Sequence, residues 1–178
     1  VGVPAILGLA DADQVVMDLE NQLGTAVFEI PTGPPSVPGL RLFVAFTGQL
    51  TLNGVKQLLG NHVQAVKPQP TGGFLLEVGS SLAGQMVRSQ GVILATGRFL
   101  GNGLKADRHG IREALFDLPV FQPQERSSWH RMEFFDVQGH PANQAGLEVD
   151  QTFRPLGGTD CPAFERLYAA GSILAHQD

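Results

Sequence analysis

Cationic and titratable side chains are concentrated between residues 105 and 136 of a chain whose formal net charge is −5. If this segment is helical, Arg108 and Arg112 lie one turn apart and can hold one phosphate group as a fork of directed N–H donors. His109 lies between them and is a candidate general base for the proton of a substrate hydroxyl. The sequence therefore predicts an anion-binding, catalytic group made of these residues. The alternative is a solvated surface segment whose charges are neutralised by nearby carboxylates, namely Asp107, Glu113, Asp117 and Glu125.

A second candidate site begins where a short apolar run gives way to small residues. Val92–Leu94 is apolar and rich in β-branched residues, which is typical of a strand covered on both faces in a largely parallel sheet. Ala95, Thr96 and Gly97 follow it directly. Parallel sheets bind ligands beyond the carboxyl ends of their strands, and small residues there let backbone amides approach a planar cofactor or its pyrophosphate. The alternative is an ordinary tight turn after a core strand.

The end of the chain repeats this pattern. Residues 167–170, Leu-Tyr-Ala-Ala, are followed by Gly171 and Ser172, so a second apolar run also closes in small residues and a glycine. We expect the two runs to be neighbouring strands whose small-residue ends open on the same side and line one crevice. The cofactor-binding residues predicted here are Ala95, Thr96, Gly97, Gly171, Ser172 and Asp178.

This pair of strand ends resembles the two-dinucleotide-binding-domain flavoproteins, in which both turns flank the flavin. Three further runs resemble one family within that group, the B subunits of anaerobic glycerol-3-phosphate dehydrogenase. They are Pro-Pro-Ser-Val-Pro-Gly-Leu-Arg-Leu at residues 34–42, His-Gly-Ile-Arg-Glu at 109–113 and Asp-Gln-Thr-Phe-Arg-Pro at 150–155. The family's second run begins with Asn where this chain has His109. The resemblance covers nearly the whole chain.

The resemblance implies a fold, a cofactor, a reaction and partners. The fold is α/β, a partial Rossmann-like FAD-binding fold with a small antiparallel β-meander and an inserted α+β cap segment. The cofactor is FAD or FMN in the full-length protein, and the reaction oxidises glycerol 3-phosphate, a small phosphorylated substrate, to dihydroxyacetone phosphate. The implied partners are a catalytic sister subunit and a membrane-anchoring iron–sulfur subunit. The implied location is cytoplasmic, with peripheral attachment to the inner membrane through those partners.

Two other interpretations of the same residues stay open. Residues 95–102, Ala-Thr-Gly-Arg-Phe-Leu-Gly-Asn, also resemble the strand end of flavoenzymes of the fumarate-reductase or ketosteroid-dehydrogenase type. The other interpretation is a non-enzymatic scaffold or interaction domain, in which the small-residue turns only serve packing. The runs at residues 34–42 and 150–155 favour the B subunits of the dehydrogenase over the other flavoenzymes.

Composition excludes several classes of protein. Of the 178 residues, 43% are hydrophobic, which is ordinary for a globular core, and the acidic balance argues against a general nucleic-acid-binding protein. A single cysteine, Cys161, excludes an intrachain disulfide and a metal site built on several thiolates. The five histidines lack the spacing of a helical metal site, so no metal is predicted. No apolar run approaches the roughly 20 residues that a membrane-spanning helix needs.

The chain is expected to be a fragment. It begins with Val1 rather than Met, and it contains no Gly-x-Gly-x-x-Gly, the turn that binds the pyrophosphate in flavoproteins of this kind. We therefore expect the chain by itself to bind no flavin tightly and to have no dehydrogenase activity.

Periodicity predicts the elements that position these residues. Asp11 or Asp13 can cap a helix that ends at Gly24, and residues 25–30 form a strand. Residues 40–52 form an amphipathic helix packed on a sheet. The antiparallel meander is expected at residues 62–66, 74–78 and 85–88.

The chain is expected to divide into four parts. These are a helix–strand–helix region (1–60), the meander with the Ala-Thr-Gly strand (61–104), a cap or substrate-side segment (105–145) and a return to the flavin-domain core (146–178). Aromatic and apolar side chains lie among the charges of the cap, so part of it is expected to pack over the cofactor side; they are Trp129, Met132, Phe134 and Phe135.

Overall fold

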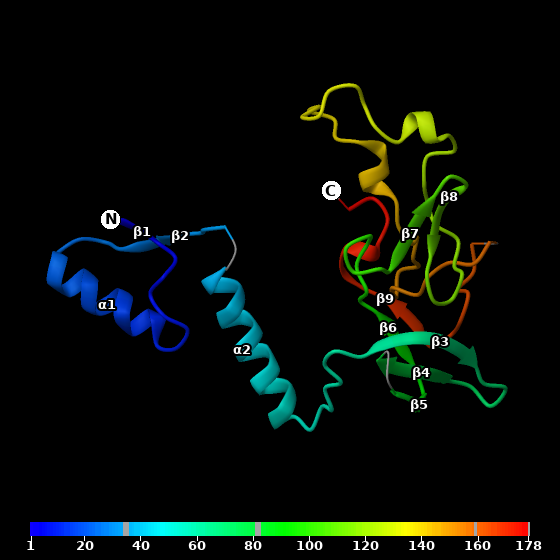
Figure 1. Ribbon diagram of the computed structural model, residues 1–178, viewed down its shortest axis with the longest axis horizontal. Coiled ribbons are helices and arrows are strands. Elements are labelled where there is room, and N and C mark those ends of the chain that lie inside the picture. Colours follow the sequence, from blue (N-terminus) through cyan, green and yellow to red (C-terminus); the bar gives the residue numbers. More distant parts are fainter. Residues whose placement is uncertain (34–35, 81–82, 159, 178) are drawn as a thin grey trace. The chain divides into compact units, whose positions relative to one another are not determined.

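The computed structural model describes residues 1–33, 36–80, 83–158 and 160–177. Contacts divide the chain into two compact units, Val1–Leu59 and Gly60–Asp178. Figure 1 colours the first unit from blue to cyan and the second from cyan to red. Among the described residues, every pair of hydrogen-bonded strands lies within one unit.

The first unit alternates strands and helices in the order β1 (Gly2–Pro4), α1 (Ala12–Leu23), β2 (Phe28–Ile30) and α2 (Val37–Leu52). Strands β1 and β2 pair in parallel, and parallel neighbours need a crossover connection, which α1 provides. The predicted helix, strand and second helix are confirmed. Strand β2 is only three residues long, and α2 begins at Val37 rather than at Leu40.

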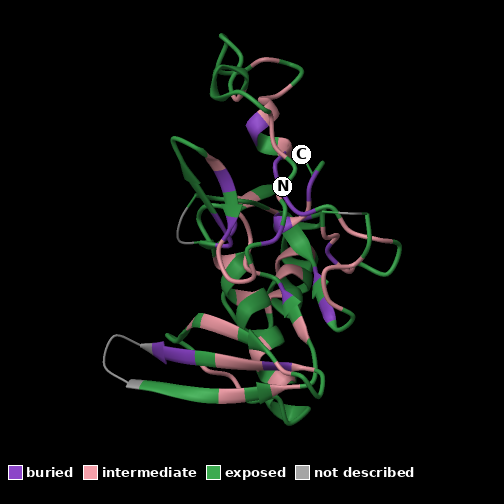
Figure 2. Cartoon of the chain, turned by 90° about the vertical axis from the view of Figure 1, so that its right-hand side faces the viewer, coloured by how far each residue is buried: buried purple, intermediate pink, exposed green. Residues whose placement is uncertain are grey.

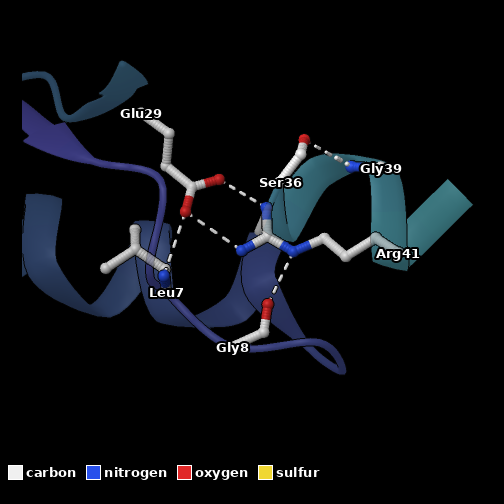
Figure 3. A network of polar contacts seen from close by, with 6 residues as sticks. All are labelled: Leu7, Gly8, Glu29, Ser36, Gly39 and Arg41. Atoms are coloured by element: carbon white, nitrogen blue, oxygen red, sulfur yellow. Dashed lines mark hydrogen bonds and ion pairs between the residues drawn. The ribbon is translucent and has the colours of Figure 1, made fainter. Parts of the chain in front are cut away.

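The ends of the two helices in this unit show which capping residues determine where each helix begins or ends. Gly24 adopts φ 66° and donates its N–H to the carbonyl of Glu20, so it ends α1 as predicted. Asp11 stands at the N-cap position, one of the two positions predicted, but it has φ 52° and its side chain makes no cap bond. Ser36 caps α2, because its hydroxyl accepts the N–H of Gly39 at 3.2 Å (Figure 3).

A polar network centred on Arg41 joins the opening loop, β2 and α2 (Figure 3). The Arg41 guanidinium forms a two-point ion pair with the Glu29 carboxylate, in which Nη2 lies 3.0 Å from Oε1. Arg41 Nε donates to the carbonyl of Gly8 at 2.6 Å, and Glu29 Oε1 accepts the N–H of Leu7 at 3.0 Å. Arg41 belongs to the family-like run at residues 34–42, and its role in this unit is structural.

Helix α2 carries apolar side chains on most of its surface, and none of its described residues is buried. Leu42, Phe46 and Leu52 are 70%, 62% and 80% exposed. The predicted packing of this helix on a sheet is therefore wrong for the described residues of the unit.

The second unit opens with an antiparallel sheet of β3 (His62–Pro68), β4 (Phe74–Ser80) and β5 (Ala83–Ser89), with β4 in the middle. This sheet confirms the predicted meander. Phe74 at the start of β4 is 3% exposed, and its ring packs edge-on against Phe116 and Phe164. These ring contacts join the meander to the core of the unit.

Two short strand pairs complete the regular structure of this unit. Strands β6 (Val92–Leu94) and β9 (Leu167–Ala169) pair in parallel, and β7 (Leu104–Asp107) forms an antiparallel hairpin with β8 (Gly110–Glu113) (Figure 1). Short 3-10 turns occur at η1 (Arg126–Ser128), η2 (Pro141–Gln144) and η3 (Gly171–Ile173). The chain thus combines helices with parallel and antiparallel strands, as expected in coarse terms for an α/β protein.

The core of the second unit surrounds the parallel pair. Ile93 and Tyr168 lie side by side in the register of β6 and β9, and they are 68% and 38% exposed. The pair is thus covered on one face only, so the predicted coverage of both faces is wrong for the described residues. The side chains that cover it or lie within it, each at most 1% exposed, include Leu94, Leu104, Leu147, Leu167 and Ile173.

The predicted cap, residues 105–145, consists of the β7–β8 hairpin, loops and 3-10 turns, and none of its residues is in an α-helix. Its predicted α+β character is therefore wrong. Trp129 packs against the core as expected, but Met132, Phe134 and Phe135 are 102%, 81% and 89% exposed. They lie on a loop that projects at the top of Figure 2, where most of residues 130–140 have the exposed colour.

Candidate functional site

The carboxyl ends of β6 and β9 lie side by side. Leu94 is in register with Ala169, and the N–H of Ala170 donates to the carbonyl of Leu94 at 2.9 Å. Because the strands are parallel, the residues that follow them leave the sheet at the same edge. The prediction of neighbouring strands whose small-residue ends open on one side is confirmed.

Both strand ends turn at a glycine in the left-handed backbone region. Gly97 has φ 66° and Gly171 has φ 79°, a conformation that glycine adopts without strain. A Cβ atom on Gly97 would lie 3.4 Å from Ser172 Oγ, so a side chain at this position would contact the second turn. We call residues 95–98 and 170–172 together the twin-turn site.

Arg98 links the two turns. Its Nε donates to the carbonyl of Ser172 at 2.8 Å, and its Nη2 donates to the carbonyl of Gln177 at 2.5 Å. Carbonyl groups carry no net charge, and no described carboxylate forms an ion pair with Arg98. Arg98 therefore brings to the twin-turn site a positive charge that no described carboxylate neutralises.

The loop after Gly97 folds tightly back on the first turn. The N–H groups of Gly103 and Leu104 both donate to the carbonyl of Arg98, at 3.0 and 3.3 Å. A Cβ atom on Gly101 would lie 1.9 Å from the carbonyl oxygen of Thr96, and one on Gly103 would lie 2.1 Å from that of Gly97. Only glycine permits this approach, so the spacing of these glycines serves to pack the loop on the turn.

A pocket of about 700 Å³ opens beside the first turn. Its walls include Thr96, Asn102 and Lys105, together with the start of β3 at His62. Thr96 Oγ1 is buried and has no hydrogen-bond partner among the described residues. A buried hydroxyl without a partner costs free energy, so a ligand atom that reached Thr96 Oγ1 would complete its hydrogen bonding.

The run at residues 150–155 supports the second turn. Asp150 accepts the N–H groups of Thr152 and Arg154 at 2.8 and 3.0 Å and pairs with the Arg154 guanidinium at 2.7 Å. These contacts, led by the N–H of Arg154, hold the pKa of Asp150 well below its usual range. The loop that they fix presents the carbonyl of Phe153 to the N–H of Ala169 at 2.9 Å, on β9. The run therefore has a structural role at the end of β9.

The predicted anion-binding group lies on the β7–β8 hairpin rather than on a helix. Asp107 and Gly110 face each other in register, so Arg108 and His109 form the two-residue turn between the strands. Arg112 lies on β8, and its Nη2 is 3.9 Å from Asp107 Oδ2. Arg108 and Arg112 are therefore not one helical turn apart, and the predicted helical fork is wrong.

His109 is held within the hairpin turn. Its N–H donates to Asp107 Oδ1 at 2.7 Å, and its Nε2 accepts from Arg108 Nε at 3.1 Å. The N–H of His109 is the main cause that lowers the pKa of Asp107, and the Arg112 charge adds to it. Strand β7 rises about 10 Å between Leu104 and Asp107. The structure therefore does not bring His109 to the twin-turn site.

Glu113 is a buried structural residue rather than a surface counter-charge. It is 2% exposed, and its carboxylate accepts the N–H of Leu115 at 2.9 Å and that of Phe116 at 2.6 Å. The alternative in which Glu113 neutralises surface cations is therefore wrong for this residue, whereas Asp107 does face Arg112.

Comparison with known proteins identifies the family. A family model described as FAD binding domain matches residues 1–178. The chain belongs to this FAD-binding family. The chain is also similar to the probable anaerobic glycerol-3-phosphate dehydrogenase B subunit of Halobacterium salinarum, with 36% identity over 176 residues, which are 98% of this chain and 40% of that protein.

Bacterial relatives carry the same name. The identity to the anaerobic glycerol-3-phosphate dehydrogenase B subunit of Vibrio vulnificus is 32% over 177 residues, 99% of this chain and 40% of that protein. For the corresponding protein of Vibrio cholerae it is 28% over 177 residues, again 99% of this chain and 40% of that protein. The chain thus spans 40% of the length of these relatives. No solved structure matches it.

The twin-turn site fits the cofactor of the FAD-binding family. FAD has a pyrophosphate that accepts backbone N–H groups and positive charge, and a planar ring with polar edges. Ala95 and Gly171 are exposed small residues that let a ligand approach the backbone closely. Arg98 supplies positive charge, and Thr96 Oγ1 supplies a hydroxyl without a partner among the described residues. The residues present therefore suit FAD.

The structure brings together five of the six predicted cofactor-binding residues, from Ala95 to Gly97 and from Gly171 to Ser172, and Asp178 lies outside the described residues. Sequence reasoning missed Arg98, because bonds to main-chain carbonyls leave no motif. Within the described parts of the chain, no group of three His, Cys, Asp or Glu residues could hold a metal ion. The same parts contain no helix that is long and apolar enough to cross a membrane.

Proposed function

We propose that this chain is part of an FAD-dependent dehydrogenase that oxidises glycerol 3-phosphate to dihydroxyacetone phosphate. The observation that carries the proposal is the twin-turn site, in which two parallel strands end in left-handed glycines joined through Arg98. The family match supports the choice of FAD, and the names of the relatives support the reaction.

The backbone of the twin-turn site is proposed to hold FAD, with Ala95 to Gly97 on one side and Gly171 and Ser172 on the other. When bound, FAD supplies the two-electron acceptor for the oxidation of an alcohol. Arg98 is proposed to stabilise negative charge on the bound cofactor, because its guanidinium has no described carboxylate partner. Thr96 Oγ1 is proposed to hydrogen-bond to the cofactor.

We propose that β6 and β9 are neighbouring strands of a Rossmann-like parallel sheet. Ile93 and Tyr168 give the exposed face of the strand pair an apolar surface. Parallel sheets are normally covered on both faces, so an apolar surface on this face supports the arrangement. The meander of β3 to β5 and the segment at residues 105–145 are proposed to be additions to that sheet.

Oxidation of the substrate alcohol removes a hydride from carbon and a proton from the hydroxyl, and the phosphate needs cationic groups to hold it. Arg108 and His109 are proposed for the substrate side, whereas Arg112 is left out because its guanidinium faces Asp107. A catalytic sister subunit and a membrane-anchored iron–sulfur subunit are the proposed partners. Through them a cytoplasmic protein would work at the inner membrane.

The test uses the full-length protein purified with its flavin. We expect a flavin absorption band, FAD as the nucleotide released on denaturation, and bleaching of the band when glycerol 3-phosphate is added without oxygen. Absence of flavin would assign the chain to a scaffold role. If succinate or a ketosteroid bleaches the flavin band and glycerol 3-phosphate does not, the protein is a flavoenzyme of the fumarate-reductase or ketosteroid-dehydrogenase type.

The 178-residue chain alone is proposed to bind FAD weakly and to be inactive. Ala95, Ala170, Gly171 and Ser172 are exposed, whereas a ligand site buries most of the surface of its ligand. A titration of this chain with FAD and with FMN, followed by flavin fluorescence, measures the affinity. Binding at micromolar concentration or tighter would contradict this expectation.

A further inference from the structure

A second hollow lies on the side of the hairpin turn. It has a volume of about 360 Å³, near the lower end of the roughly 300 to 1,000 Å³ that is usual for small-molecule sites. Three segments line it: the hairpin turn at residues 108–110, residues 122–124, and the η1 region with Arg126 and Trp129. The hollow belongs wholly to the second unit and does not include the twin-turn residues.

The wall of this hollow is fixed by hydrogen bonds. The side chain of Gln122 accepts the N–H of Ile111 at 2.6 Å and donates to the carbonyl of the same residue at 2.7 Å. Ile111 is 4% exposed and belongs to the core. The next residue back, Phe121, exchanges two backbone hydrogen bonds with Gly146, at 2.8 and 3.1 Å. The hairpin turn and the facing segment are therefore held together.

Two guanidinium groups of this hollow lack a carboxylate partner among the described residues. Neither Arg108 nor Arg126 takes part in a described ion pair. The carboxylates nearest to them in the sequence have other partners. Asp107 accepts the N–H of His109 and faces Arg112. Glu125 accepts a hydrogen bond from the hydroxyl of Ser127 at 3.2 Å. The hollow therefore has an excess of positive charge.

The cations are oriented by neighbouring rings. Arg108 Nε donates to His109 Nε2 at 3.1 Å, which leaves its terminal nitrogens free of described hydrogen bonds. The guanidinium carbon of Arg126 lies 6.0 Å from the centre of the Trp129 ring. A guanidinium that lies on the face of an aromatic ring still has its N–H groups available to donate to an anion. A single oxyanion can accept hydrogen bonds from two guanidinium groups at once.

We propose that this hollow binds the phosphate group of a small phosphorylated ligand, with Arg108 and Arg126 as its cationic ligands. The pair replaces the predicted pair of Arg108 and Arg112, because Arg112 lies outside the hollow and faces Asp107. That the ligand is glycerol 3-phosphate rests on the proposed function, whereas phosphate binding itself does not.

The experiment measures binding of inorganic phosphate and of glycerol 3-phosphate to the full-length protein by equilibrium dialysis, with glycerol and sulfate as comparisons. The variants are Arg108→Gln, Arg126→Gln and the matched control Arg112→Gln, which removes an arginine from the same hairpin but outside the hollow. Each of the first two variants should raise Kd for both phosphates by about tenfold, since hydrogen bonds to a charged partner are lost. The control should change Kd by less than about twofold, as expected for an exposed charge.

The outcomes separate this inference from the proposed function. An equal loss of binding in Arg112→Gln, an unchanged Kd in the other two variants, or no saturable phosphate binding would overturn the hollow as a phosphate site. Circular dichroism spectra of all variants show whether a loss reflects unfolding; if one does, Arg108→Lys and Arg126→Lys replace the glutamine variants and should show a smaller loss. A third outcome is also distinguishable: the Arg108 and Arg126 variants weaken phosphate binding, but glycerol 3-phosphate does not bleach the flavin. This result would confirm the phosphate site and would reject glycerol 3-phosphate as the substrate of the dehydrogenase.

Discussion

Arg98 Nε lies 2.8 Å from the carbonyl oxygen of Ser172 and so joins two turns that are 74 residues apart in the sequence. The parallel pairing of β6 and β9 brings these turns to one edge, and the arginine then fixes their spacing. A side chain that both ties the backbone and carries charge can contribute to ligand binding in two ways. The first prediction separates them.

Replacement of Arg98 should weaken FAD binding to the full-length protein. Arg98→Ala removes both bonds to main-chain carbonyls, and we expect Kd for FAD to rise by about tenfold. Arg98→Lys keeps the charge, but one ammonium group does not reproduce the forked donor geometry, so it should recover only part of the affinity. The matched control is Arg88→Ala, an exposed arginine on β5. Full recovery with lysine would show that charge alone matters.

The hydroxyl of Thr96 should act with opposite sign in the free and the FAD-bound protein. Thr96→Val removes a buried hydroxyl that has no described partner, so the FAD-free protein should gain about 1 kcal/mol in free energy of unfolding. The same change should weaken FAD binding by about fivefold, because a hydrogen bond to the cofactor is lost. Urea unfolding and FAD titration measure the two effects.

A contrasting variant checks the sign of the Thr96 effect. Thr152 Oγ1 donates to Asp150 Oδ1 at 2.8 Å, so Thr152→Val breaks a made hydrogen bond and should lower stability. If Thr96→Val also destabilises the FAD-free protein, the Thr96 hydroxyl has a partner in the folded chain and the argument for a cofactor contact fails.

Gly103 should not tolerate a side chain. A Cβ atom there would lie 2.1 Å from the carbonyl oxygen of Gly97 and 2.4 Å from Thr96 Oγ1, so the loop and the first turn must separate. Gly103→Ala is expected to lower the free energy of unfolding by about 2 kcal/mol and to weaken FAD binding as well. Gly158→Ala is the control, because apart from its chain neighbours no described residue has an atom within 4 Å of a Cβ atom at that position. Equal stability of the two variants would contradict the tight loop.

The sequence was sufficient to predict the features that depend on local patterns. The two strand ends could be paired because both consist of an apolar run followed by small residues and a glycine. The meander followed from alternating residues between glycine-rich turns, and the end of α1 followed from Gly24. Each of these signals acts within a few residues, so it is visible without knowledge of the fold.

Features that depend on distant contacts could not be predicted. The hairpin that carries Arg108 and Arg112 was interpreted as a possible helix, although Gly110, with φ 145°, and the Asp107 side chain close a two-residue turn there. Arg98 was missed because its partners are carbonyls far along the chain. The exposure of Ile93 depends on which other elements pack on the strand pair, and a strand's own sequence does not contain that information.

Glu113 should be essential for stability rather than for charge balance at the surface. Its buried carboxylate accepts the N–H groups of Leu115 and Phe116, so Glu113→Ala leaves two donors without an acceptor. We expect a loss of about 2 to 4 kcal/mol in the free energy of unfolding, measured with urea. Glu125→Ala, an exposed glutamate in the same segment, should change stability by less than about 0.5 kcal/mol. Similar values for both variants would place Glu113 at the surface.

The ion pair of Glu29 and Arg41 should make the first unit sensitive to acid. The hydrogen bond from Arg41 is the main cause that lowers the pKa of Glu29 from 4.5 to about 2. A carboxylate whose pKa is lower in the folded state stabilises that state above the unfolded pKa, and the contribution is lost as the pH falls through the folded pKa. The stabilisation that the network of Figure 3 contributes should therefore be complete above pH 4.5 and be lost progressively as the pH falls to about 2, where the folded Glu29 carboxyl itself titrates.

Nuclear magnetic resonance of the Glu29 carboxyl carbon and of the Arg41 Nη–H groups can follow this transition. The two signals should titrate together, because the same ion pair holds both groups. In Glu29→Gln the side chain cannot ionise, so the Arg41 signal should stay constant over the same pH range while the hydrogen bond to the carbonyl of Gly8 remains. A Glu29 carboxyl that titrates near 4.5, its ordinary value, would show that the ion pair does not form in solution and that Arg41 holds the loop through Gly8 alone.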